Sequence, residues 1–159
     1  AQSYYMNLFK LILTFFFIGN VKIAPGTIAS FATVVIFYAF AVHLSILSFM
    51  LIISAITVLS FFAVDSYTTG HLEKDKSEIV IDEVIGQSIA LLPLLIFVET
   101  PLPKFFMCII SLFFFRFFDI LKPYPINKID KMNNTFGVIF DDILAGIFAA
   151  LLLTFVLRF

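Results

Sequence analysis

Charged side chains are scarce in this sequence of 159 residues. Lys, Arg, Asp and Glu make up 13% of it, the hydrophobic types make up 62%, and the mean hydropathy is +1.10. A soluble domain of this size is usually about half apolar and about a quarter charged. Too few polar side chains are present to cover a water-facing surface, so the composition predicts an integral membrane protein. The net charge of −1 gives no broad basic surface for nucleic acid.

Cysteine and histidine are also nearly absent. The single cysteine, Cys108, lies in an apolar run and has no partner for an internal disulfide bond. The two histidines are His43 and His71, and neither lies beside the acidic motifs described below. Cys108 and Arg116 are eight positions apart, and no Asp-x-Asp motif occurs. These absences exclude a histidine nucleophile, a Cys-x5-Arg loop and a phosphoaspartate motif.

Long apolar runs dominate what is present. The run at 28–69 has no charge before Asp65 and is long enough for two spans of about 20 residues, with Ser45 as a cap at the break between them. Prolines and charges separate three further spans, at 79–98, 105–121 and 137–157. The prediction is an all-α fold, a polytopic membrane helix bundle of about five spanning helices plus a short, partly embedded N-terminal helix. We expect one domain over residues 1–159, with Met6 as the native start and residues 1–5 as an added remnant.

The distribution of lysines orients this bundle. Cytoplasmic loops of membrane proteins carry an excess of Lys and Arg. With the N-terminal segment in the cytoplasm, two basic residues, Lys104 and Arg158, lie outside. Seven then lie inside: Lys10, Lys22, Lys74, Lys76, Lys122, Lys128 and Lys131. The N-terminus is therefore predicted to be cytoplasmic, and His43 and His71 fall on opposite sides of the bilayer.

In this topology the unusual acidic residues converge at one level, just below the cytoplasmic headgroups. They begin the third span, end the fourth and begin the fifth: Asp82, Glu83, Asp119, Asp141 and Asp142. Carboxylates held together repel one another, and Mg²⁺ prefers oxygen ligands of this kind. We therefore expect these five residues to form a catalytic metal site. The alternative for each one alone is solvation at the headgroups. Five other acidic residues are expected in solvated loops: Asp65, Glu73, Asp75, Glu78 and Asp130.

Small residues repeat with the acidic ones at helical spacing. Asp142 shares a stripe with Ala145, Gly146 and Ala149, and Asp82 shares one with Gly86 and Ala90. Small side chains allow another helix to approach closely. Each stripe therefore marks a face where another helix can pack closely. Adjacent helical residues point about 100° apart, so one carboxylate of each acidic pair can face the metal while the other supports it or binds a second ion.

Two features could bind an anion. Arg116, Asp119 and Lys122 lie on one face of the fourth span, where the cations form either an intrahelical ion-pair ladder or a phosphate site. Both readings remain open from the sequence. Gly26 and Thr27 follow Pro25 at a predicted helix start, where free backbone N–H groups favour anions. With the histidine, cysteine and phosphoaspartate mechanisms excluded, we expect metal-assisted catalysis in which a carboxylate acts as the general base.

Four segments resemble the phosphatidylglycerophosphatase A family in order and spacing over roughly residues 15–155: IAPGTIAS, IVIDEVIG, FRFFDILKPYPINKID and GVIFDDILAG. Two places depart from the family's usual pattern, Ala29-Ser30 after the Pro-Gly-Thr turn and Asn-Thr-Phe-Gly at 134–137. The resemblance implies Mg²⁺-dependent removal of the terminal phosphate of phosphatidylglycerophosphate. It also implies a multi-pass protein of the bacterial cytoplasmic membrane, with its active site facing the cytoplasm. The matching functional residues are Asp82, Glu83, Asp119, Lys122, Asp141 and Asp142, and the first motif is Pro25, Gly26 and Thr27.

Two other functions remain open from the sequence. Carboxylates inside a membrane also mark ion paths, as in a small cation-coupled transporter. Such a transporter needs acidic residues at mid-depth with access from both faces. A CDP-alcohol phosphotransferase-like enzyme is also metal-dependent, but its Asp-Gly…Ala-Arg…Gly…Asp…Asp pattern is absent. The sequence leaves the oligomeric state open.

Overall fold

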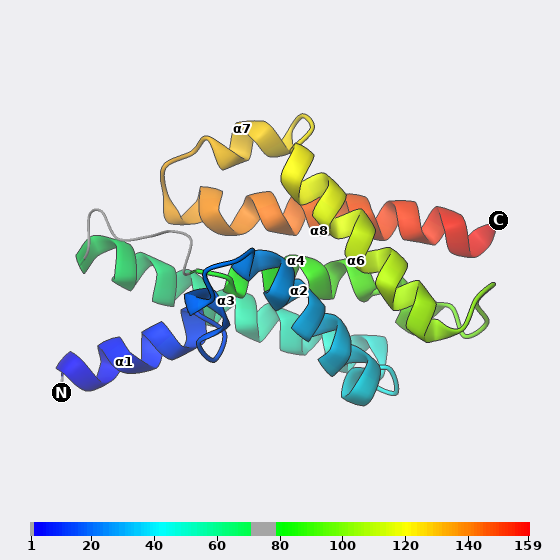
Figure 1. Ribbon diagram of the computed structural model, residues 1–159, viewed down its shortest axis with the longest axis horizontal. Helices are drawn as coiled ribbons and strands as arrows, with labels where there is room; N and C mark the ends of the chain where they lie inside the picture. The colour runs from blue at the N-terminus through cyan, green and yellow to red at the C-terminus, as the bar shows by residue number, and fades with distance from the viewer. Residues whose placement is uncertain (1, 71–78) are drawn as a thin grey trace.

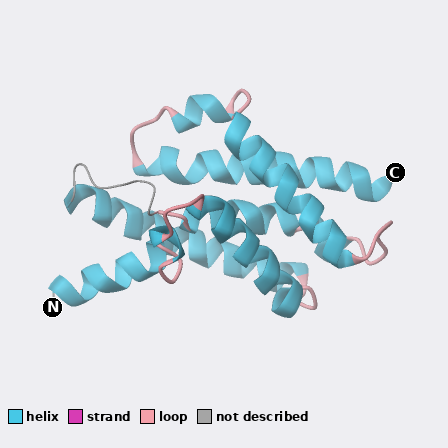
Figure 2. Ribbon diagram, viewed as in Figure 1, coloured by secondary structure: helices cyan, strands magenta, loops and turns pink. Residues whose placement is uncertain are grey.

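The computed structural model describes residues 2–70 and 79–159, and every regular element in these ranges is helical (Figures 1 and 2). The elements follow in this order: α1 Gln2–Leu13, η1 Ile18–Asn20, α2 Pro25–Ile36, η2 Phe37–Ala41, α3 Ile46–Gly70, α4 Ile81–Leu91, α5 Pro93–Ile96, α6 Lys104–Leu121, α7 Ile126–Asp130 and α8 Thr135–Arg158. The predicted all-α class is confirmed. His71, Glu73, Lys74, Asp75, Lys76 and Glu78 lie outside the described residues.

Local sequence signals set the ends of the main helices. Pro25 opens α2 at a position where its missing N–H costs nothing. Ser45 precedes α3, and its Oγ accepts a hydrogen bond from the Ser48 backbone N–H at 3.2 Å, as a cap should. The Asn134 side chain caps α8 by accepting from Gly137 N at 2.8 Å. At the end of α6, Lys122 adopts a left-handed conformation (φ 45°) directly before Pro123, which stops the helix.

Two of the predicted spans are less regular than their apolar runs imply. The run at 79–98 is divided, because Pro93 lacks the N–H that would continue α4 and starts the short α5 instead. The first span begins as α2 and ends in the π-helical turn η2, which gives a shorter apolar helix over Pro25–Ala41. Hydropathy alone detects neither break.

The helix α4 occupies the middle of the bundle. It packs against α2, α3, α6 and most extensively α8, which runs beside it in the same direction (Figure 1). At their crossing, a methyl group added to Gly146 would lie 2.3 Å from the backbone oxygen of Gly86. Only glycine permits so close an approach. Each stripe was expected to admit another helix, and the structure shows that the two stripes pack against each other.

Two helices of the described chain are long and apolar enough to cross a membrane. They are Ile46–Ser66 within α3 and Thr135–Arg158, which is α8. Only 22% of the most apolar window of the first and 44% of that of the second is buried inside the protein. A soluble core helix would be mostly buried, so these exposed apolar faces favour contact with lipid. The five-span count is not confirmed by these lengths and remains a prediction.

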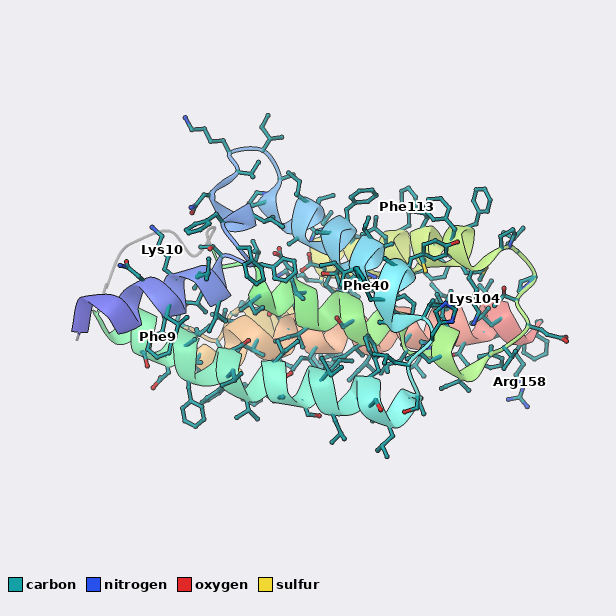
Figure 3. All side chains as sticks on the ribbon, turned by 90° about the horizontal axis from the view of Figure 1, so that it is seen from below. Phe9, Lys10, Phe40, Lys104, Phe113 and Arg158 are labelled. Carbon is teal, nitrogen blue, oxygen red and sulfur yellow. The ribbon has the colours of Figure 1, made fainter. Side chains whose placement is uncertain are left out.

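Three of the basic residues used to orient the chain lie toward opposite ends of the bundle. Figure 3 shows Lys10 toward one end, and Lys104 and Arg158 toward the other. This arrangement agrees with the predicted orientation, in which Lys10 is cytoplasmic and the other two are outside.

Candidate active site

A charged cavity of about 360 Å³ lies where four of the helices begin or end. The starts of α2 and α4, the end of α6 and the first turns of α8 surround it, and α7 lies beside it. All five carboxylates predicted to form the site line this cavity, together with Asp130, Arg116 and Lys122. Six carboxylates therefore face two cations in one small space.

Helix geometry delivers these side chains to the same place. Asp82 and Glu83 lie in the first turn of α4, Asp119 lies in the last turn of α6, and Asp141 and Asp142 lie in the second turn of α8. The four aspartates are no more than 9% exposed. Since α4 and α8 run in the same direction, their acidic pairs meet at one end of the bundle. This placement does not provide the mid-depth path that a transporter requires.

Glycines allow the backbones to approach this cavity closely. A methyl group on Gly26 would lie 1.9 Å from Glu83 Oε1, and one on Gly86 would lie 2.5 Å from the backbone oxygen of Asp142. Gly26 thus makes room for the Glu83 carboxylate at the start of α2, and Gly86 allows α8 to bring Asp142 against α4. Both glycines belong to motifs that the sequence analysis singled out.

Arg116 contacts two of the carboxylates. Its Nη1 donates a short hydrogen bond to Asp119 Oδ2 and lies 3.6 Å from Glu83 Oε1. The Arg116–Asp119 pair is the i, i+3 contact of the predicted ladder. The guanidinium also ties α6 to α4 across the cavity, which a ladder within one helix would not do.

Lys122 makes its ion pairs outside its own helix. Its Nζ lies 2.7 Å from Asp141 Oδ2 on α8 and 2.6 Å from Asp130 Oδ1 on α7. Burial lowers the pKa of Lys122, but hydrogen bonds and charge attraction from Asp130 and Asp141 outweigh it, so the net pKa is raised above the usual 10.5. Lys122 is therefore a permanent positive charge at the cavity, with two carboxylate partners.

Asp130 is a cavity residue that sequence reasoning placed in a solvated loop. It ends the short helix α7 and is partly exposed, but it lines the cavity and binds Lys122. Its contact depends on how residues 122–134 fold back over the start of α8, which no periodicity encodes. Asp65, expected in a loop as well, lies within α3 and accepts a hydrogen bond from Thr135 Oγ1 at 3.2 Å.

The residues of the first motif, Pro25, Gly26 and Thr27, line two different surfaces. Pro25 and Gly26 line the cavity, so Gly26 lies where a phosphate site was predicted. Thr27 does not line it; its side chain is exposed and lines an apolar groove on the neighbouring surface.

The carboxylate oxygens of the cavity are the type of ligand that a hard divalent cation prefers. The charges of Asp142, Asp82 and Asp119 are close enough to interact, and Glu83 Oε2 is buried without a hydrogen-bond partner. An unpaired carboxylate oxygen among other carboxylates is the environment that Mg²⁺ relieves. Across the described residues, however, no three such side chains are yet arranged to hold an ion.

The fold and the cavity together define an all-α protein with apolar outer faces and a charged site lined by six carboxylates and two cations. The family model described as Phosphatidylglycerophosphatase A matches residues 11–157. The chain belongs to this family, which confirms the resemblance drawn from the four motifs, and it is therefore a phosphatase. No solved structure gives a significant match.

Curated relatives cover most of the chain. A Phosphatidylglycerophosphatase A of Haemophilus influenzae is 31% identical over 92% of this chain and 86% of its own length. One of Escherichia coli with the same description is 28% identical over 94% of this chain and 84% of its own. A Putative phosphatidylinositol-3-phosphatase of Bacteroides thetaiotaomicron is 32% identical over 90% and 89%. All three names describe phosphatases that act on a phosphomonoester of a phospholipid, and the headgroup that they name differs.

Proposed function

We propose that this protein hydrolyses the terminal phosphomonoester of phosphatidylglycerophosphate to phosphatidylglycerol and phosphate, with Mg²⁺ as its cofactor. We place the reaction at the cytoplasmic face of the bacterial inner membrane, in a multi-pass protein. The observation that carries the proposal is the cavity that gathers six carboxylates and two cations at one end of apolar helices. The family membership and the names of two relatives support the headgroup.

The cations of the cavity would bind the phosphate. Arg116 and Lys122 present guanidinium and ammonium donors to the same space, and charge-assisted hydrogen bonds of this kind are strong. Both cations already neutralise carboxylates, so a phosphate would share them with Asp119 and Asp141. Because six carboxylates face only these two cations, a phosphate dianion would also need the positive charge of Mg²⁺ to bind there.

The carboxylates would act as the general base and as ligands of the metal ion. In hydrolysis the water oxygen forms a bond to phosphorus, the ester P–O bond breaks, and the water proton passes through a general base to the leaving glycerol oxygen. Asp82, Asp119, Asp141 and Asp142 are the buried candidates for this base, and Glu83 Oε2 is the free oxygen beside them. Mg²⁺, held by members of this set, would supply a hard cation that offsets their repulsion and the charge of the phosphate.

The decisive experiment is phosphate release by purified protein in detergent. We expect release from phosphatidylglycerophosphate with Mg²⁺, loss of release with EDTA, and recovery when Mg²⁺ is restored. Phosphatidylinositol 3-phosphate serves as the matched substrate, because one relative carries that name. Preference for the inositol lipid would reassign the headgroup, and no release of either from folded protein would overturn the proposal.

A further inference from the structure

An apolar groove lies beside the charged cavity, on the surface of α6. Its volume is about 1020 Å³, and seven of its nine lining residues are hydrophobic, six of them from α6 and Leu152 from α8. The other two are Thr27 and Arg116. From Leu112 to Leu121 the groove follows α6 for about 14 Å, at a rise of about 1.5 Å per residue.

Arg116 joins the groove to the cavity, because it lines both. Its Nη1 contacts Asp119 and Glu83 in the cavity. Its Nε is buried and has no hydrogen-bond partner in the protein. A donor therefore stays unsatisfied at the boundary between the charged space and the apolar one, where a ligand with a polar head and an apolar tail would place ester or phosphate oxygens.

We propose that this groove binds an acyl chain of the glycerolipid substrate while its terminal phosphate occupies the cavity. The inference rests on the proposed function and adds a tail-binding site to it. The continuity through Arg116 matches the connectivity of a phospholipid, in which polar headgroup and apolar chain adjoin. Thr27, a polar group on the groove side, then lies near the glycerol backbone of the lipid rather than at the phosphate.

The groove is open on its outer side, as a lipid site inside a bilayer requires. Phe113 is 68% exposed and Ile120 is 66% exposed. Figure 3 shows Phe113 on the outer side of the bundle. A chain can therefore lie against α6 without leaving the surrounding lipid.

The test compares a lipid substrate with its deacylated headgroup, using Phe117→Ala and Ile120→Ala. Both positions line the groove, and neither lines the cavity. Phe62→Ala is the matched control, an equally exposed phenylalanine on α3 away from the groove. We expect the groove variants to raise the apparent KM for the diacyl lipid about tenfold, which is a typical effect of removing hydrophobic contacts from an apolar pocket. Their kcat/KM for the deacylated headgroup should equal that of the unaltered protein.

Equal losses on both substrates, or no difference from Phe62→Ala, would overturn the tail site. A chain-length series on the unaltered protein gives a second test that needs no variant. With short-chain lipids below their critical micelle concentration, kcat/KM should rise with each added methylene until the groove is filled. No dependence on chain length would overturn the proposal, whereas no hydrolysis of any substrate would instead overturn the proposed function.

Discussion

Two adjacent aspartates in an apolar helix differ in their surroundings. Asp141 pairs with Lys122, whereas Asp142 faces the carboxylates of Asp82 and Asp119 and has no cation partner among the described residues. Both are buried. An unpaired buried carboxylate in such company is unstable unless a proton or a metal ion neutralises it. Asp142 is therefore a residue whose charge calls for a cation that the described side chains do not supply.

Replacing Asp142 by Asn should abolish turnover and leave the fold intact. The change keeps the shape of the side chain and removes one charge from a crowded set, so the melting temperature without Mg²⁺ should rise. Phosphate release should fall by about 10² or more. Stabilisation by added Mg²⁺ should shrink, because the stabilisation that a ligand gives at a fixed concentration decreases as its binding weakens. Asp141→Asn should also abolish release. Full activity in both variants would show that the site is misassigned.

Replacing Lys122 by Ala should mainly raise the KM for the lipid. If the ammonium holds phosphate, we expect a rise of about tenfold, with Lys122→Arg recovering part of it. Because the pKa of Lys122 is raised, the amine stays charged from about pH 7 to about pH 9. The ratio of the KM of Lys122→Ala to the KM of the unaltered protein should therefore not change over that range. Lys128→Ala, an exposed lysine on α7 outside the cavity, is the control. An unchanged KM would favour a purely structural ion pair.

At the scale of elements, helical periodicity predicted the faces of α4 and α8 that admit a close neighbour, but not that these two helices contact each other. The stripes Asp82, Gly86 and Asp142, Gly146 both lie at the α4–α8 crossing, because a period of 3.6 residues fixes which side chains share a face. The same rule does not predict the break at Pro93 or the role of Asp130. The first depends on one residue inside a long apolar run, and the second depends on the path of a connection between helices.

Gly86→Ala should weaken the bundle and the activity together. The added methyl group would meet the Asp142 backbone oxygen at 2.5 Å, so α8 would have to move away from α4. Overpacking of this kind costs about 1–3 kcal/mol. We expect a lower melting temperature and reduced phosphate release, since the same shift displaces Asp142. Ser54→Ala on the exposed face of α3 is the matched control, and equal stability of the two variants would contradict the close crossing.

At the scale of the whole molecule, the charges and the apolar faces have separate places. The cavity carboxylates gather at one end of α4, α6 and α8, while Phe, Leu and Ile side chains remain exposed along α3, α6 and α8. A headgroup can thus enter the charged cavity while the rest of the lipid stays against apolar helix faces. This division agrees with a site at the level of the cytoplasmic headgroups and makes the orientation of the chain a direct test of the proposal.

Thiol labelling in membrane vesicles would determine that orientation. Cys108 is fully buried, so the unaltered chain should not react with a membrane-impermeant reagent and serves as background. Glu99 and Asn133 are exposed, one in the connection before α6 and the other in that before α8. We expect Glu99→Cys to be labelled from the periplasmic side and Asn133→Cys only from the cytoplasmic side, because positive residues cluster on the cytoplasmic face. Labelling of both from one side would mean that α6 does not cross the membrane, and the reverse pattern would place the cavity outside the cell.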